Sequence, residues 1–229
     1  MSCKYSCGYI ARSIAPESQS ASINKLICYT RYMTHHEHPV KLLAFVGLAG
    51  SGKTSAVEYL SAKGYPKVYF GGIINKAMRE IGLEPGSDWE REAKFREEIR
   101  EREGKDFVVK RAINEIRDLM AAGQHQIVLD GLYTWTEYKI LRHEFPGEMT
   151  VVAIVTPKHL RKQRLAKRPE RPMTAQQVDE RDWEEIENLE KGGPIAVADH
   201  FIHNDGSLEK LHEQVDVALQ TIDIRSWSF

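Results

Sequence analysis

The stretch that most constrains the fold is GLAGSGKT, residues 47–54, which directly follows the apolar run LLAFV. Three glycines in eight residues cost backbone entropy, so the stretch must need conformations or close approaches that side chains would forbid. It matches the pattern GxxxxGK[ST] and stands between an expected strand and an expected helix. We therefore expect a loop whose backbone lies against a ligand; a glycine-rich turn that binds nothing is the alternative.

The chemistry that suits this pattern is the capture of phosphate. Consecutive backbone N–H groups turn inward around phosphate oxygens, and the following helix points the positive end of its dipole at the same place. Lys53 is expected to bridge the β- and γ-phosphates, and the hydroxyl of Thr54 to bind Mg²⁺. The predicted nucleotide-binding residues are Gly47, Leu48, Ala49, Gly50, Ser51, Gly52, Lys53, Thr54 and Ser55.

Composition limits the other functions open to the chain. Its 229 residues are 41% hydrophobic and 28% charged, which is typical of one soluble globular domain. Lys plus Arg number 32 against 33 for Asp plus Glu, so no overall basic field attracts nucleic acid. No apolar run approaches the roughly 18 residues that a membrane span needs. All three cysteines precede residue 29, which favours a cytoplasmic protein without structural disulfides.

The chain is expected to begin with a separate segment. Residues 1–39 are rich in serine and lack a clear hydrophobic period, so we predict a disordered N-terminal extension. Three explanations of this segment compete: a mispredicted start upstream of a true one at Met33, a flexible tail, or an organelle transit peptide. The folded domain is expected at 40–222, with a C-terminal tail at 223–229.

From Val40 onward short apolar runs alternate with long amphipathic ones, which indicates βαβ units and a parallel sheet. Asp106 is expected to cap one helix, and Thr174 with Gln177 forms a capping-box pattern that opens another. The expected strands are 42–46, 68–70, 127–129, 151–155 and 201–202. The expected helices are 53–62, a charged one within 89–106, 107–122, 136–144, 158–167, 175–190 and a last one after Ser207.

Arg79, Arg96 and Arg100 lie in a first arginine-bearing segment, where they could hold the phosphate or carboxylate of an acceptor. Glutamates are interleaved with these arginines, so a solvated helix with Glu–Arg pairs is the alternative.

A second arginine-bearing segment contains Arg161, Arg164 and Arg168 at spacings of three and four, which places three guanidiniums on one helix face. No acid lies within 158–167 to balance them, so the pattern favours a lid that contacts phosphate during transfer over a solvated helix.

Asp130 ends an apolar strand, so its carboxylate should emerge at the carboxyl end of the sheet beside the phosphate loop. It could bind Mg²⁺ through its water shell, accept a proton from a hydroxyl nucleophile, or simply stabilise a turn. The nearby Tyr133 and Trp135 could contact a base ring, although packing in the core is the favoured interpretation.

With these residues identified, the chain from about Lys41 to Leu219 resembles the P-loop kinase group that contains dephospho-CoA kinases and nucleoside monophosphate kinases such as adenylate kinase. It is most similar to an uncharacterised, mostly archaeal family in that group. The matching pieces are VGLAGSGKT, EREGKD, VLDG, RLAKR, ERDWEE and ADHFIHNDGSLEKL.

The resemblance implies an α/β, three-layer P-loop NTPase fold, in which helices flank a five-stranded parallel sheet and a helical acceptor-binding region and a lid are added. It also implies ATP as donor, Mg²⁺ as cofactor, and contact of Arg161, Arg164 and Arg168 with the transferred phosphoryl group. The sequence departs from dephospho-CoA kinases at VYFGG, where they carry a presumed catalytic Asp and this chain has Gly71 and Gly72. Adenylate kinase-like proteins usually carry a glycine–aspartate pair there, whereas Ile73 follows Gly72.

The function expected from these observations is an ATP-dependent small-molecule kinase that acts on a nucleotide-like acceptor. A nucleoside monophosphate presents an ionised phosphate and needs no general base, whereas the hydroxyl of dephospho-CoA needs one, and only Asp130 is placed to serve. The lack of a second candidate base narrowly favours a phosphate over a hydroxyl as the acceptor group. The expected catalytic residues are Lys53, Asp130 and the three lid arginines. The alternative is a regulatory or binding module that hydrolyses nucleotide without a small-molecule acceptor.

Overall fold

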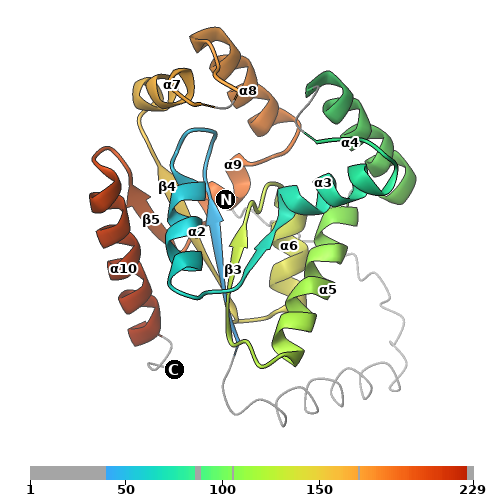
Figure 1. The fold of residues 1–229 in the computed structure, drawn as a ribbon. Helices are drawn as coiled ribbons and strands as arrows, with labels where there is room; N and C mark the ends of the chain where they lie inside the picture. Colours follow the sequence, from blue (N-terminus) through green and yellow to red (C-terminus); the bar gives the residue numbers. More distant parts are fainter. Residues whose placement is uncertain (1–39, 86–88, 105, 170, 226–229) are drawn as a thin grey trace, which may run out of the picture. The chain divides into compact units, whose positions relative to one another are not determined.

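Five parallel strands form one sheet in the order β2-β3-β1-β4-β5 (Figure 1). The computed structural model describes residues 40–85, 89–104, 106–169 and 171–225, so the predicted extension at 1–39 lies outside the described residues. Each predicted strand is present, with bounds that differ by one or two residues. The strands are β1 (Lys41–Val46), β2 (Lys67–Tyr69), β3 (Gln126–Asp130), β4 (Met149–Val155) and β5 (His200–His203).

Helices cover both faces of the sheet and complete three layers, which confirms the predicted α/β fold. Figure 1 shows α2 and α10 on one side of the sheet and α5 and α6 on the other, while α7 and α8 lie beyond the carboxyl ends of the strands. The helices are α2 (Lys53–Ala62), α3 (Phe70–Glu80), α4 (Trp89–Glu103), α5 (Phe107–Ala121), α6 (Trp135–Glu144), α7 (Lys158–Ala166), α8 (Ala175–Glu187), α9 (Gly192–Ala196) and α10 (Leu208–Arg225).

The core is built from strands that are apolar on both faces, as buried parallel strands require. Alternate residues of β1, Leu43 and Phe45, face α2 and α10 and are buried. Full burial of a large apolar side chain stabilises the fold by about 1.5–3 kcal/mol relative to exposure. The apolar cluster on this face contains Leu43, Phe45, Ala56, Val57, Leu60, Val128, Val152, Ile154, Ile202, Leu211 and Val215.

The strand order places the phosphate loop at a switch point of the sheet. Strand β1 lies between β3 and β4, so the chain that leaves its carboxyl end enters the crevice where strand order reverses. The register pairs Phe45 with Asp130 on one side and Val46 with Ala153 on the other. The loop that starts at Gly47 therefore emerges beside Asp130.

Two helices, α3 and α9, were not expected. Helix α3 begins at Phe70, immediately after β2, and contains Gly71 and Gly72 in its first turn. Glycine disfavours helix, but the residues that this helix buries recur at helical spacing: Phe70, Ile73, Ile74, Ala77 and Met78. Burial of that apolar stripe outweighs the poor local propensity.

The helix ends agree with the expected caps in one case and differ in another. Thr174 and Gln177 form the predicted capping box at the start of α8. Asp106 precedes α5 but makes no side-chain cap, because its backbone is not extended and its carboxylate pairs with Lys110 at 2.7 Å instead. The last helix, α10, continues to Arg225, past the predicted domain end at 222.

Candidate functional site

The loop between β1 and α2 adopts a backbone conformation that favours glycine. Gly50 and Gly52 have φ angles of 77° and 98°, in the left-handed region. A Cβ atom at Gly52 would lie 2.2 Å from Asn204 Nδ2, and one at Gly50 would lie 3.0 Å from Leu165 Cγ. The glycines therefore serve close packing against α7 and the loop after β5, in addition to backbone conformation.

Hydrogen bonds from outside the loop fix its carbonyl groups. The carbonyl oxygen of Ser51 accepts from Asn204 Nδ2 at 2.8 Å and from Thr156 Oγ1 at 3.0 Å. Because α2 starts at Lys53, its first N–H groups have no intrahelical acceptor, and Gly52 offers no side-chain cap. The buried Ser51 hydroxyl also has no hydrogen-bond partner among the described residues. These unfilled donors fit the binding of an anion at this helix start.

Lys53 lies half-buried at the centre of the site, with its Nζ 5.8 Å from the centroid of the Tyr133 ring. Burial lowers the pKa of its ammonium group, and this effect outweighs the attraction of nearby carboxylates. The charged side chains that act on Lys53 are Asp130, Glu185, Arg181 and Arg168. Groups from β3, from α8 and from the end of α7 therefore converge on the loop lysine.

Asp130 stands where the sequence predicts it, at the carboxyl end of β3, and only 5% of it is exposed. Burial raises the pKa of its carboxyl group, while the positive charge of Lys53 opposes that rise. Its role as a base or a metal ligand stays a prediction.

The residues expected to hold magnesium fit that ion. Thr54 is exposed in the first turn of α2, and Asp130 supplies a carboxylate beside Lys53. No group of three or more His, Cys, Asp or Glu side chains that could hold a metal occurs in the described part of the chain. Magnesium is usually bound through one or two protein oxygens together with water and phosphate, so this sparse set of hard oxygen donors is suitable.

Arg161, one of the three arginines expected on one helix face, lies on α7 but is already paired with an acid. Its guanidinium is buried and donates to both carboxylate oxygens of Asp182, at 2.7 and 2.6 Å, and to the carbonyl oxygen of Ala49 at 3.1 Å. The balancing acid was missed because it comes from α8. Contact of Arg161 with a transferred phosphoryl group stays a prediction and would require this pair to open.

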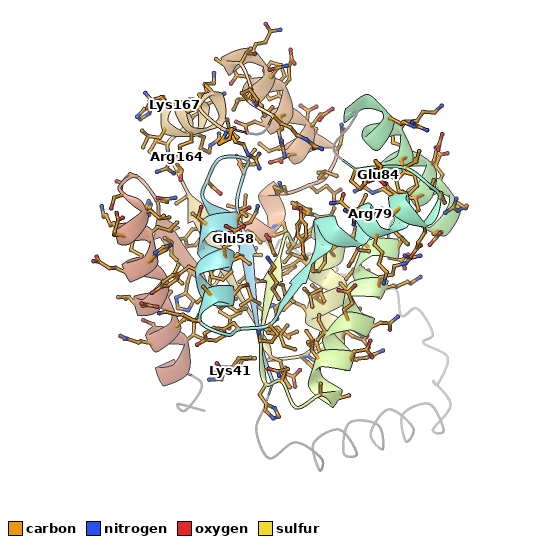
Figure 2. The ribbon with its side chains drawn as sticks, in the orientation of Figure 1. Lys41, Glu58, Arg79, Glu84, Arg164 and Lys167 are labelled. Atoms are coloured by element: carbon orange, nitrogen blue, oxygen red, sulfur yellow. The ribbon has the colours of Figure 1, made fainter. Side chains whose placement is uncertain are left out.

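The other two lid arginines are placed differently. Arg164 donates through Nη2 to Asn204 Oδ1 and the carbonyl of Gly206, at 3.4 and 3.3 Å, while its buried Nη1 has no partner among the described residues. Arg168 is exposed beyond the end of α7 and lies near enough to Lys53 to lower its pKa. Figure 2 shows Arg164 on α7, on the side of α10.

Of the three arginines predicted to bind the acceptor, the structure describes the side chains of Arg79 and Arg100. Arg79 is exposed in the last turn of α3, on the opposite side of the view from Arg164 (Figure 2). The side chain of Arg96 lies outside what the structure describes. Arg100 is half-buried and acts on the carboxylate of Glu137, whose pKa burial raises and Arg100 lowers. Their predicted role is not decided by these positions.

Tyr133 is a neighbour of the site's cations. Its ring lies near two ammonium groups, Lys53 and Lys191, and burial raises the pKa of its hydroxyl above the ordinary value. Trp135 is half-buried and stacks on Tyr138 with the ring centroids 4.9 Å apart. Both rings have protein partners but neither is fully buried, so packing in the core and contact with a base ring both stay predictions.

Sequence reasoning missed two charged residues of the site, Glu185 and Lys191. Lys191 is 2% exposed and forms an ion pair with Glu185 at 2.9 Å. Burial lowers the pKa of Lys191 to about 8, although Glu185 opposes this. The signal available in the sequence was the segment ERDWEE, which contains Glu185, but nothing local indicated a role for the lysine.

No helix in the described ranges has the length and apolar character needed to span a membrane.

Comparison with known proteins agrees with this geometry. Residues 43–191 match the family model described as an AAA domain. A UPF0200 protein of Thermococcus gammatolerans is 34% identical over 184 residues, which cover 79% of this chain and 95% of that protein.

Solved structures agree on the fold. The structure of TT1252 from Thermus thermophilus superposes with a TM-score of 0.57 at 18% identity, over 81% of this chain and 98% of that one. Dephospho-CoA kinase from Campylobacter jejuni superposes with a TM-score of 0.51 at 18% identity, over 79% and 96%. The expected likeness to the P-loop kinase group and to an archaeal family within it is confirmed. The chain therefore belongs to the UPF0200 family, and its AAA domain has the fold of the P-loop kinases.

Proposed function

We propose that the protein is an ATP-dependent phosphotransferase that moves the γ-phosphoryl group of ATP to a small nucleotide-like acceptor, such as a nucleoside monophosphate or dephospho-CoA. The observation that carries the proposal is the preformed phosphate loop, with the Lys53 ammonium and the Asp130 carboxylate at its open end.

Each residue has a part in this chemistry. Transfer breaks the bond between the γ-phosphorus and the bridging oxygen of ADP and forms a bond from that phosphorus to an acceptor oxygen. Lys53 and the first N–H groups of α2 hold the phosphates and offset their charge. Thr54 and Asp130 would hold Mg²⁺, which when bound neutralises charge on the phosphate oxygens. Arg168, exposed and near Lys53, is the lid arginine best placed to stabilise the moving phosphoryl group.

The nature of Asp130 bears on the acceptor. Burial raises the pKa of this carboxyl group toward the range in which a base is useful, while the positive charge of Lys53 opposes the rise. The start of α3 carries Gly71 and Gly72 against the Tyr69 ring and offers no second carboxylate. An acceptor that is already ionised, such as a nucleoside monophosphate, needs no general base and therefore suits this arrangement best.

The test is a coupled assay in which ATP and Mg²⁺ are offered with a panel of nucleoside monophosphates and with dephospho-CoA. We expect ADP release that depends on one class of acceptor, with the phosphorylated acceptor identified by ³¹P NMR. Lys53→Met should abolish the activity. Lys63→Met is the matched control, because Lys63 directly follows the same helix but bonds to Asp216 on the surface.

Two results would contradict the proposal. One is ATP hydrolysis at the same rate with every acceptor, accompanied by a large nucleotide-dependent change in proteolysis, which favours a regulatory module. The other is activity that survives Lys53→Met.

A further inference from the structure

A carboxylate of the protein occupies part of the phosphate loop. The backbone N–H of Ala49 donates to Glu185 Oε2 at 3.3 Å. Glu185 lies on α8, 136 residues further along the chain, and only 5% of it is exposed. One of the loop amides therefore already faces an anion, and that anion belongs to the protein.

Two cations hold the same carboxylate. Lys191 Nζ lies 2.9 Å from Oε2, and Arg181 Nε lies 3.2 Å from Oε1. Burial acts to raise the pKa of Glu185, but attraction to these two cations outweighs it and keeps the pKa below its ordinary value. A backbone amide, an ammonium and a guanidinium form the kind of donor set that binds phosphoryl oxygens.

This cluster is continuous with the phosphate site. The Nζ atoms of Lys191 and Lys53 lie 4.7 and 5.8 Å from the centroid of the same Tyr133 ring. Glu185 and Arg181 both act on the pKa of Lys53. The Glu185 cluster and the loop lysine therefore belong to one continuous charged site.

The backbone directly before Lys191 adopts an unfavourable conformation. Glu190 has a φ of 53°, in the left-handed region that costs a non-glycine residue about 1 kcal/mol or more. That turn comes directly before the residue whose side chain is 2% exposed. A buried ammonium is costly unless it is paired, so Lys191 needs an anion whenever it carries its proton.

We propose that Glu185 is an internal substitute for a phosphoryl group, and that a substrate phosphoryl group displaces it from the Ala49 N–H and binds Lys191 and Arg181. The proposal rests on the proposed function and extends it, because it adds Lys191 and Arg181 to the phosphate-binding residues. Two anions cannot share these donors, since like charges a few ångströms apart repel strongly at a buried site. The displacing group is either the terminal phosphoryl of the donor or the phosphate of the acceptor.

The test measures ligand affinity of the full chain by calorimetry. The variants are Glu185→Gln, which removes the competing charge, and Glu185→Asp, which keeps the charge but withdraws it by one methylene from Ala49. Glu184→Gln is the matched control, because Glu184 is the exposed neighbour on α8. The probes are Mg²⁺–ADP, the Mg²⁺ complex of the imido analogue of ATP, and AMP added to the Mg²⁺–ADP complex.

We expect both Glu185 variants to bind a probe about five-fold or more tightly than wild type, while Glu184→Gln does not change. An effect on the ATP analogue but not on ADP assigns the position to the donor's terminal phosphoryl group. An effect on AMP assigns it to the acceptor. Lys191→Met should weaken binding of the same probe, and Lys191→Arg should restore it.

The contact itself is checked by the ¹H–¹⁵N signal of Ala49, which should shift in the Glu185 variants and on addition of the displacing probe to wild type. Unchanged affinity in folded Glu185 variants, with wild type still binding nucleotide, would overturn this inference and leave the proposed function intact. Tighter binding in those variants together with acceptor-independent hydrolysis would support this inference and overturn the proposed function.

Discussion

Arg161 and Asp182 form a bidentate ion pair buried between α7 and α8, with nitrogen–oxygen distances of 2.7 and 2.6 Å. The same guanidinium donates to the carbonyl of Ala49, while the N–H of Ala49 donates to Glu185. The backbone carbonyl of Ala49 is therefore held by α7 and its backbone N–H by α8. The positions of α7 and α8 and the shape of the glycine-rich loop are therefore coupled through Ala49.

Asp182→Asn should strongly destabilise the protein. It leaves the buried Arg161 charge without a counter-ion, and breaking a buried pair from one side costs about 3–5 kcal/mol. Asp179→Asn is the control, because Asp179 pairs with Lys158 and Lys162 near the surface and its loss should destabilise the protein much less. The free energy of unfolding in urea measures both changes. Equal losses in the two variants would contradict a special role for the buried pair.

Gly52→Ala should impair both stability and nucleotide binding. The new Cβ would meet Asn204 Nδ2, which itself bonds to the Ser51 carbonyl. Gly123→Ala is the matched control, since Gly123 has a similar φ of 82° but no atom within 4 Å of a new Cβ. Both variants should lose about 1–2 kcal/mol from the left-handed backbone.

Only Gly52→Ala should also raise the Kd for Mg²⁺–nucleotide, by about ten-fold or more, since 1.4 kcal/mol of lost binding energy corresponds to a factor of ten. Calorimetric titration of both variants is the measurement. Normal affinity in folded Gly52→Ala would show that close packing against Asn204 is dispensable.

The buried Lys191 predicts an unusual dependence of stability on pH. Its pKa is lowered by burial from 10.5 to about 8, while the groups that face it are Glu185 and Arg181 from α8, Lys53 from α2 and the ring of Tyr133. Between these two pKa values the unfolded chain keeps a proton that the folded chain has released. The free energy of unfolding therefore gains a contribution that rises with pH across this window.

The measurement compares wild type with Lys191→Met by urea unfolding at pH 7.5 and pH 10. The shift in the pKa of Lys191 sets the size of the effect. The free energy of unfolding of wild type should rise relative to that of Lys191→Met by roughly 1–3 kcal/mol between the two pH values. A constant difference between the two proteins at all pH values would mean that Lys191 titrates at the same pH in the folded and unfolded chain.

Local features of the site could be predicted from the sequence. The strand, the glycine-rich loop and the helix that starts at Lys53 are adjacent in the chain, so their spacing alone fixes the phosphate-binding geometry. Asp130 follows from the same logic, because the last residue of a buried parallel strand must emerge at the carboxyl edge of the sheet. The capping box of Thr174 and Gln177 is a contact between residues three apart.

The tertiary structure alone decided which charges meet. Arg161 faces inward because Asp182, 21 residues later, is brought against it, and Glu185 reaches Ala49 across 136 residues. Helix α3 likewise forms despite its glycines because the folded core buries its apolar stripe. Helical spacing fixes which side chains share a face, but the direction in which that face points depends on docking against segments that are distant in the chain. The phosphate loop follows from local spacing, whereas the charges that surround it depend on the packing of α7 and α8.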